Sequence, residues 1–203
     1  MRADWTLLTG PTTEPISVES ARSRLRVVGS ADDPEIIEMI RGVRSQAEEY
    51  LHRGLLTQTW KYQQDNWTDE IRLPMAAPLQ SVASVKYFDD AGAQQTLATS
   101  VYQVELVPEP GFIALKPNQA WPTLQSNRAL PIEIQYLVGW TEPSLVPGAI
   151  LHALFLLLGQ RFRWRGDDDA HLVDASKRGA LDNPGAEALL TPFRVWWREP
   201  VRA

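Results

Sequence analysis

Residues 33–64, DPEIIEMIRGVRSQAEEYLHRGLLTQTWKYQQ, contain the change of period that decides the fold. Asp33 and Pro34 are typical of the start of a helix, and Gly54 is typical of the left-handed residue that ends one. Between them, apolar residues recur every three or four positions, as on one face of an α-helix. These residues are Ile36, Ile40, Val43, Ala47 and Tyr50. We therefore predict a helix over residues 34–53.

From Thr57 the period falls to two, which places Trp60 and Tyr62 on one face of a strand. More alternating segments follow as far as Val138, separated by turn sequences such as DDAG at 89–92. We predict strands at 57–64, 70–73, 81–88, 94–97, 102–107, 112–116 and 130–138. Helical patterns lie outside this region, in a short segment that begins at Ser17 and in a strongly apolar one after Pro147.

This order predicts an α+β fold in which a small helical bundle from both chain ends carries an inserted, mostly antiparallel β domain. The expected division is residues 1–56 as N-terminal helices of the bundle, 57–141 as the β domain, 142–165 as a C-terminal bundle helix, and 166–203 as a flexible loop followed by a tail. A chain of 203 residues is long enough to bury a core without covalent links.

Composition limits the function classes. The chain has 20 Lys and Arg against 25 Asp and Glu, a net charge of −5, which argues against a general nucleic-acid coat. It has no cysteine, and therefore no disulfide or thiolate metal site. No apolar run approaches the roughly 20 residues that cross a bilayer, so we expect a soluble protein without a membrane partner. Eight tryptophans favour protein interfaces as well as a core.

No catalytic pattern is present: the sequence lacks a nucleophile elbow, an HExxH motif, a Walker loop and a dinucleotide fingerprint. Asp167, Asp168, Asp169 and His171 carry oxygen and imidazole groups that could bind a hard cation. A solvated acidic loop is the more ordinary interpretation, because the three acids are consecutive. We expect no enzyme activity and no cofactor.

A basic and aromatic stretch follows the apolar helix. It consists of Arg161, Phe162, Arg163, Trp164 and Arg165. Positive charge at a helix C-terminus is favoured by the helix dipole, and this is the simpler interpretation. The alternative is a contact patch for an acidic neighbour or a phosphate backbone.

The C-terminus is the second unusual segment. Phe193, Val195, Trp196 and Trp197 are interspersed with arginines behind Pro192. Exposed apolar surface of this kind is costly, so the segment either folds back on its own domain or docks into another protein. Aromatic and arginine side chains are common in interface hot spots, which slightly favours docking. Fully extended, the chain after Leu190 reaches roughly 43 Å, enough to enter a neighbouring subunit.

Taken together, the motifs resemble the head–tail connector (adaptor, or head-completion) proteins of long-tailed phages and gene-transfer particles. The resemblance covers nearly the whole chain and rests on the order and spacing of several stretches. They are EPISVESARSRLRV at 14–27, DDPEII at 32–37, AEEYLHRGLLTQTW at 47–60, IRLP at 71–74, LQSV at 79–82, YLVGW at 136–140 and LLTPFRVW at 189–196.

The resemblance implies a structural role. Such proteins form a dodecameric homo-oligomeric ring beneath the portal protein, at the head–tail junction of the virion, and are assembled in the host cytoplasm. The ring carries the head–tail stopper or tail terminator, and DNA passes through its lumen without specific binding. A portal-docking segment would comprise Leu189, Leu190, Pro192, Phe193, Arg194, Val195, Trp196 and Trp197. Arg161, Phe162, Arg163, Trp164 and Arg165 would contact a subunit or the portal.

The residues are also compatible with two other functions. A carbohydrate- or receptor-binding module of a phage tail would present Trp67, Trp121 and Trp140 as an exposed, coplanar platform. A hydrolase would use a metal site between Asp167 and His171.

Overall fold

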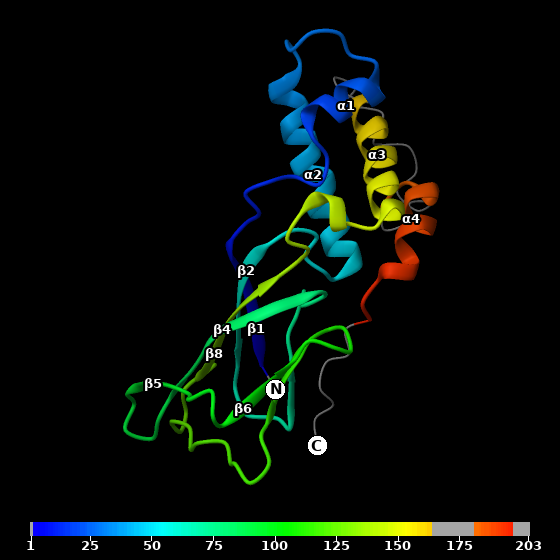
Figure 1. Ribbon diagram of the computed structural model, residues 1–203. Helices are drawn as coiled ribbons and strands as arrows, with labels where there is room; N and C mark the ends of the chain where they lie inside the picture. Colours follow the sequence, from blue (N-terminus) through cyan, green and yellow to red (C-terminus); the bar gives the residue numbers. More distant parts are fainter. Residues whose placement is uncertain (1, 164–180, 197–203) are drawn as a thin grey trace. The chain divides into compact units, whose positions relative to one another are not determined.

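The structure is a computed structural model that describes residues 2–163 and 181–196. It has the α+β architecture that the sequence predicts, with helices and antiparallel sheets in one chain. Contacts divide the chain into two compact units, each visible in Figure 1. The strand unit comprises the described residues of 2–11, 52–140 and 195–196, and the helical unit those of 12–51, 141–163 and 181–194.

The strand unit contains two sheets, in which every pairing of named strands is antiparallel. The five-stranded sheet has the order β1 (Ala3–Thr9), β2 (Gln58–Gln64), β8 (Ile132–Val138), β4 (Leu79–Phe88) and β5 (Gln94–Thr96). The three-stranded sheet has the order β3 (Glu70–Arg72), β7 (Phe112–Leu115) and β6 (Tyr102–Glu105). The seven strands predicted between residues 57 and 138 are thus confirmed, each end to within two residues.

One apolar core joins the two sheets. Tyr62 of β2 lies opposite Ile134 of β8, and both side chains are buried. The residues that alternate with them, such as Lys61 and Gln135, are polar and only half-buried, so one face of the larger sheet is apolar and the other is not. The cluster takes side chains from both sheets: Tyr62, Ile71, Leu73, Ala76, Leu79, Val85, Leu97, Tyr102, Ile113, Ile132, Ile134, Tyr136 and Val138.

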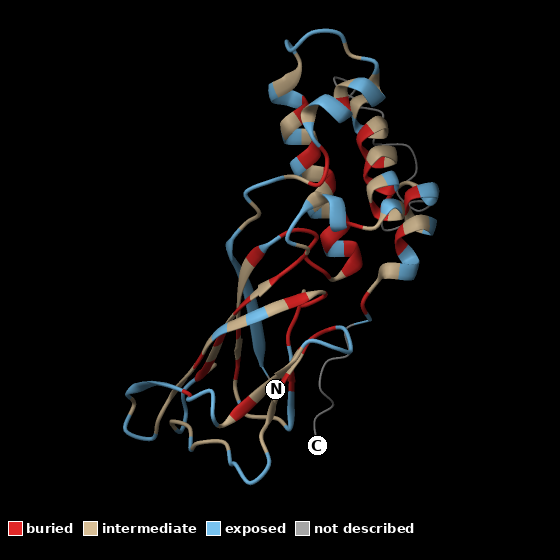
Figure 2. Cartoon of the chain, in the orientation of Figure 1, coloured by how far each residue is buried: buried red, intermediate tan, exposed pale blue. Residues whose placement is uncertain are grey.

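β1 is the element that the sequence analysis missed. Residues 3–9 were expected to belong with the N-terminal helices, and instead they add an edge strand to the five-stranded sheet. All seven residues of β1 are exposed, as Figure 2 shows. A strand with two exposed faces has no alternation of buried and exposed positions, so its sequence carries no period to detect.

The helical unit consists of α1 (Val18–Leu25), α2 (Asp33–Leu51), α3 (Gly148–Arg163) and α4 (Pro184–Leu190), with two 3₁₀ turns, η1 (Pro143–Leu145) and η4 (Thr191–Phe193). Ser17 caps α1 as predicted, because its hydroxyl accepts a hydrogen bond from the Ser20 amide (3.2 Å). The apolar stripe predicted for α2 is buried along its length. Among the described helices, none is long and apolar enough to cross a membrane.

The prediction that Gly54 ends α2 in a left-handed conformation is wrong. His52 takes that conformation, with a φ of 53°, and α2 ends at Leu51. Gly54 serves another purpose, because a Cβ there would lie 2.6 Å from Val138 Cγ2. The glycine is needed for close packing against β8, which a local helix-end rule does not consider.

Candidate functional site

The C-terminal segment begins with a well-anchored helix. The Asn183 side chain caps α4 by accepting from the Ala186 amide (2.9 Å), and its amide nitrogen donates to Gln160 Oε1 on α3 (2.6 Å). Gln160 in turn donates to the Asp182 carbonyl oxygen (2.9 Å). These bonds fix the start of α4 on the last turn of α3, so the segment that follows has a defined origin.

The segment after α4 is held against the C-terminal end of α2 by Tyr50. The Tyr50 hydroxyl and Thr191 Oγ1 are hydrogen-bonded at 2.9 Å, and Glu187 Oε1 lies 3.4 Å from the same hydroxyl. The Arg194 guanidinium stacks over the Tyr50 ring, 4.9 Å from its centroid. One buried aromatic residue therefore sets the path of the chain from residue 187 to residue 194.

The predicted docking residues divide into two groups by exposure. Leu190 is fully buried and Val195 is 7% exposed in this chain, and their docking stays a prediction. Trp196 is 71% exposed, and Pro192 is exposed as well. Leu189, Phe193 and Arg194 are half-buried, and Trp197 lies outside the described residues.

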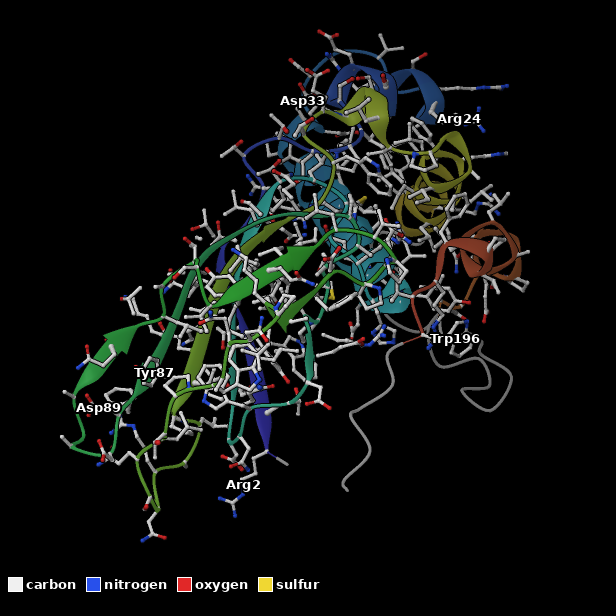
Figure 3. The ribbon with its side chains drawn as sticks, turned by 60° about the horizontal axis from the view of Figure 1, so that its bottom comes forward. Arg2, Arg24, Asp33, Tyr87, Asp89 and Trp196 are labelled. Atoms are coloured by element: carbon white, nitrogen blue, oxygen red, sulfur yellow. The ribbon has the colours of Figure 1, made fainter. Side chains whose placement is uncertain are left out.

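Figure 3 labels Trp196 at the point where the described chain ends. An exposed indole is the largest apolar side chain that a protein can present to a partner. It directly follows Val195, which is buried, and Arg194, which is stacked on Tyr50. The stacking fixes the chain as far as Arg194 within the helical unit, and the Trp196 side chain is exposed.

The basic stretch at the end of α3 is partly engaged within the helical unit. Arg161 Nη2 donates to Gln46 Oε1 on α2 (2.9 Å), and Arg161 also occupies the space that a Cβ on Gly42 would fill. Arg163 is exposed and Phe162 is half-buried. Trp164 and Arg165 lie outside the described residues, so the structure supports an anchoring role for Arg161 and leaves the contact patch untested.

A buried ion pair connects α2 to the segment before α1. Arg44 Nε donates to Glu14 and Arg44 Nη1 donates to Glu48, each at 2.7 Å. Burial favours the neutral guanidine, but the attraction of Glu48 and the hydrogen bond that Arg44 donates to Glu14 outweigh it and raise the Arg44 pKa. Arg44 therefore stays charged and fixes the approach to α1, within the stretch that carries the connector resemblance.

A second cation lies where the LLTQTW and YLVGW stretches meet. Arg53, with its side chain 8% exposed, donates to Glu109 Oε2 (2.8 Å) and lies 5.5 Å from the Trp140 ring centroid. Trp140 donates its backbone amide to the Leu55 carbonyl oxygen (3.2 Å). Gly139 has a φ of 94°, and a Cβ on it would collide with the Leu56 backbone. These residues hold two chain segments together and bring no reactive group to a cleft.

A sugar-binding module would need Trp67, Trp121 and Trp140 as an exposed, coplanar platform, and the structure does not show this arrangement. Trp67 and Trp121 stack on each other, with centroids 4.5 Å apart and planes 5° apart. Their indole nitrogens donate to the carbonyl oxygens of Pro122 (2.9 Å) and Thr68 (3.1 Å). Each ring covers one face of the other and both are half-buried, so the pair packs two loops together.

Asp65 anchors both β1 and the approach to β8. Its carboxylate accepts from the amides of Leu130 (2.9 Å) and Arg2 (3.1 Å), and these hydrogen bonds lower the Asp65 pKa despite the opposing effect of burial. Within residues 2–163 and 181–196, no group of three or more His, Cys, Asp or Glu side chains could hold a metal ion. The candidate cation residues, Asp167 to His171, lie outside that part of the chain.

No protein-family model matches the chain, and no curated protein matches it. Solved structures do. A chain in the neck of an empty gene transfer agent particle, computed with six-fold symmetry, aligns over 98% of this chain and 100% of its own length, with a TM-score of 0.76 and 20% identity. The chain has the fold of a gene transfer agent neck protein.

Two further structures agree. A chain in the virion of a native gene transfer agent gives a TM-score of 0.71 at 21% identity, covering 98% of this chain and 99% of that one. A chain in the neck of a native particle, computed with twelve-fold symmetry, gives 0.66 at 19%, covering 97% and 100%. The likeness takes in both units of the chain, and the resemblance to connector proteins is confirmed at the level of the fold.

Proposed function

We propose that this protein is a structural, non-enzymatic adaptor in the neck of a virion or gene transfer particle, where a ring of its copies joins the portal protein to the stopper or terminator of the tail. The observation that carries the proposal is the likeness to neck chains over essentially the whole length of both proteins.

The proposed ring has twelve copies. The neighbouring neck chains belong to particles computed with six-fold and twelve-fold symmetry, and both orders are compatible with a dodecamer. Cyclic rings of this kind use head-to-tail contacts, in which two different surfaces of one chain meet. The net charge of −5 suits a conduit, because a ring that bound phosphates strongly would slow the DNA that passes through it.

The portal contact in this proposal is the C-terminal segment. Tyr50, Thr191 and Arg194 set its path before the portal arrives, so little conformational entropy is lost on binding. Trp196 then inserts as an aromatic anchor, with Phe193 and Arg194 at its margin. Arg163, exposed at the end of α3, contributes to a subunit or portal contact.

The test is to replace Trp196 with Glu in the particle-producing system and to count tailed particles by electron microscopy. We expect DNA-filled heads that lose their tails, because a carboxylate cannot enter an apolar socket without a large desolvation penalty. The matched control is Leu145→Glu, at another exposed apolar residue (54% exposed). Stable tailed particles with Trp196→Glu, at the level of the control, would contradict portal docking through this residue.

A further inference from the structure

We propose that β1 is the strand through which one copy joins the next, by pairing along the outer edge of β6 in the neighbouring copy. The inference rests on the proposed ring and identifies the contact that would close it. It concerns a surface of the strand unit, distinct from the C-terminal segment of the portal contact.

β1 exposes apolar side chains without cover from the described chain. Trp5 is 45% exposed, Leu7 42% and Leu8 46%, and Figure 2 shows the whole strand in the colour of exposed residues. Natural edge strands are usually short, charged or covered, because a bare edge invites pairing with another chain. A seven-residue edge strand that carries a tryptophan and two leucines departs from that rule, which indicates a surface made for a partner.

The backbone of β1 has hydrogen-bonding groups directed outward. Asp65 donates its amide to the Arg2 carbonyl oxygen (3.1 Å), so Arg2 faces β2 in the ladder. In an antiparallel pair, alternate residues face toward and away from the partner strand. Counting from Arg2, the N–H and C=O groups of Ala3, Trp5 and Leu7 point to the outer edge, where the described residues supply no neighbouring strand.

The side chains of Trp5 and Leu7 lie on the apolar face of the sheet. Trp5 is opposite Tyr62, and Leu7 is opposite Trp60, and directly opposed residues share a face. Tyr62 is buried in the core cluster and Trp60 is packed against it. The apolar face therefore continues from the core onto β1, where it becomes exposed. A partner strand would extend both the sheet and its apolar layer.

The strand unit has a second bare edge with apolar residues. β6 is the last strand of the three-stranded sheet, and it runs into Leu106 (46% exposed) and Val107 (79% exposed). Gly111, opposite the end of β6, packs on Leu79 at the start of β4, so this end of β6 lies near β4. β2 and β8 separate β4 from β1. β1 and β6 are thus two separate edges of the strand unit.

Two different edges of one unit allow a head-to-tail contact, in which unlike surfaces meet. Pairing β1 with β1 of another copy would instead give a two-fold dimer, which ends growth after two chains. Three side chains that are less than half exposed cannot by themselves supply the roughly 800 Å² per partner of a stable interface. The contact is therefore weak between two free copies and becomes stable when a ring closes on the portal.

The experiment uses cysteine cross-linking, for which a chain without native cysteine is well suited. Leu7→Cys and Val107→Cys are combined in one full-length chain, particles are assembled, and a short bis-maleimide is added before denaturing electrophoresis. Both side chains are exposed, so the substitutions leave the core intact. We expect a ladder of covalent multimers that extends to twelve. The controls are each single variant and Leu7→Cys combined with Val28→Cys, because Val28 is 97% exposed in the helical unit.

Imaging of the same particles separates the two proposals. A neck that contains the protein but gives no ladder above the controls overturns the β1–β6 pairing and leaves the proposed function standing. Cross-linked dimers from the Leu7→Cys single variant also overturn it, in favour of two-fold pairing. A particle whose neck lacks the protein overturns the proposed function together with this inference.

Discussion

The Arg194 guanidinium lies 4.9 Å from the centroid of the Tyr50 ring, which ties the last described turn of the chain to the end of α2. Tyr50 belongs to the AEEYLHRG stretch and Arg194 to the LLTPFRVW stretch, 144 residues further along the chain. Two stretches that carry the connector resemblance therefore meet in space. Their contact fixes the position of residue 194 within the helical unit.

Replacing Arg194 with Ala should lower the free energy of unfolding by about 0.5–1 kcal/mol, the range for a partly exposed cation–π contact. Urea denaturation of the purified protein measures this change. In particles, the same variant should reduce tail retention, because the segment loses its fixed path before Trp196. Arg41→Ala, at an exposed arginine of α2 that pairs only with the exposed Glu38, is the control for a lost positive charge. If both variants retained tails equally well, a positioning role for Arg194 would be contradicted.

Replacing Arg44 with Met should be much more damaging. The Arg44 side chain is 12% exposed and binds Glu14 and Glu48, and its removal breaks both ion pairs, one of them to the nearly buried Glu48 carboxylate. Breaking a buried pair from one side costs about 3–5 kcal/mol. Thermal unfolding tests this against Arg41→Met, where the partner Glu38 is exposed and the effect should stay within about 0.5 kcal/mol. A loss at Arg44 no larger than at Arg41 would show that the pair is dispensable.

Two glycines that both have a positive φ allow the steric cost of a side chain to be compared with its conformational cost. Gly139 and Gly29 have φ values of 94° and 84°, but a Cβ at Gly139 would collide with the Leu56 backbone, whereas one at Gly29 would meet nothing within 4 Å. Gly29→Ala should cost about 1–2 kcal/mol for the left-handed conformation alone. Gly139→Ala should cost more than that, because the backbone of Leu56 must also move. Similar unfolding midpoints would show that the close approach at Gly139 is absent in solution.

The sequence predicts a helix or strand well only where one face of that element is buried in the core. The α2 stripe and the alternation of β8 were predicted because a core selects their apolar positions. β1 has no buried position and thus no pattern. The prediction placed the left-handed residue at Gly54 and not at His52, because a local helix-end rule does not consider Val138, which lies 84 residues away in sequence and packs against this glycine.

Composition indicated the candidate site, but it did not indicate which side chains of this segment are buried in the chain. The aromatic and arginine content of residues 192–196 indicated an interface, and the exposure of Trp196 fits that indication. The sequence could not reveal that Leu190 and Val195 are buried, since this depends on which residues fold over them. It also gave no sign of Tyr50 as the anchor, because Tyr50 lies on the same apolar stripe as ordinary core residues.

Asp65 should make stability depend on pH in the acid range. Hydrogen bonds from the Leu130 and Arg2 amides lower the pKa of the folded state. The carboxylate therefore adds stability above the unfolded pKa of about 3.9, and this contribution is lost as the pH falls through the lower, folded pKa. Asp65→Asn should lower the free energy of unfolding at pH 7, and in strong acid it should have the same free energy of unfolding as the wild type. Urea denaturation at a series of pH values measures this. Asp69→Asn, at an exposed aspartate, is the control, and a constant difference at all pH values would contradict the assignment.

The most direct measurement is a cryo-electron microscopy reconstruction of the neck from particles that contain this chain, computed without imposed symmetry. The account predicts a ring of twelve copies between portal and tail, with the Trp196 indole of each copy inside a pocket of the portal. A neck built without this protein, or a ring in which every Trp196 faces solvent, would contradict it.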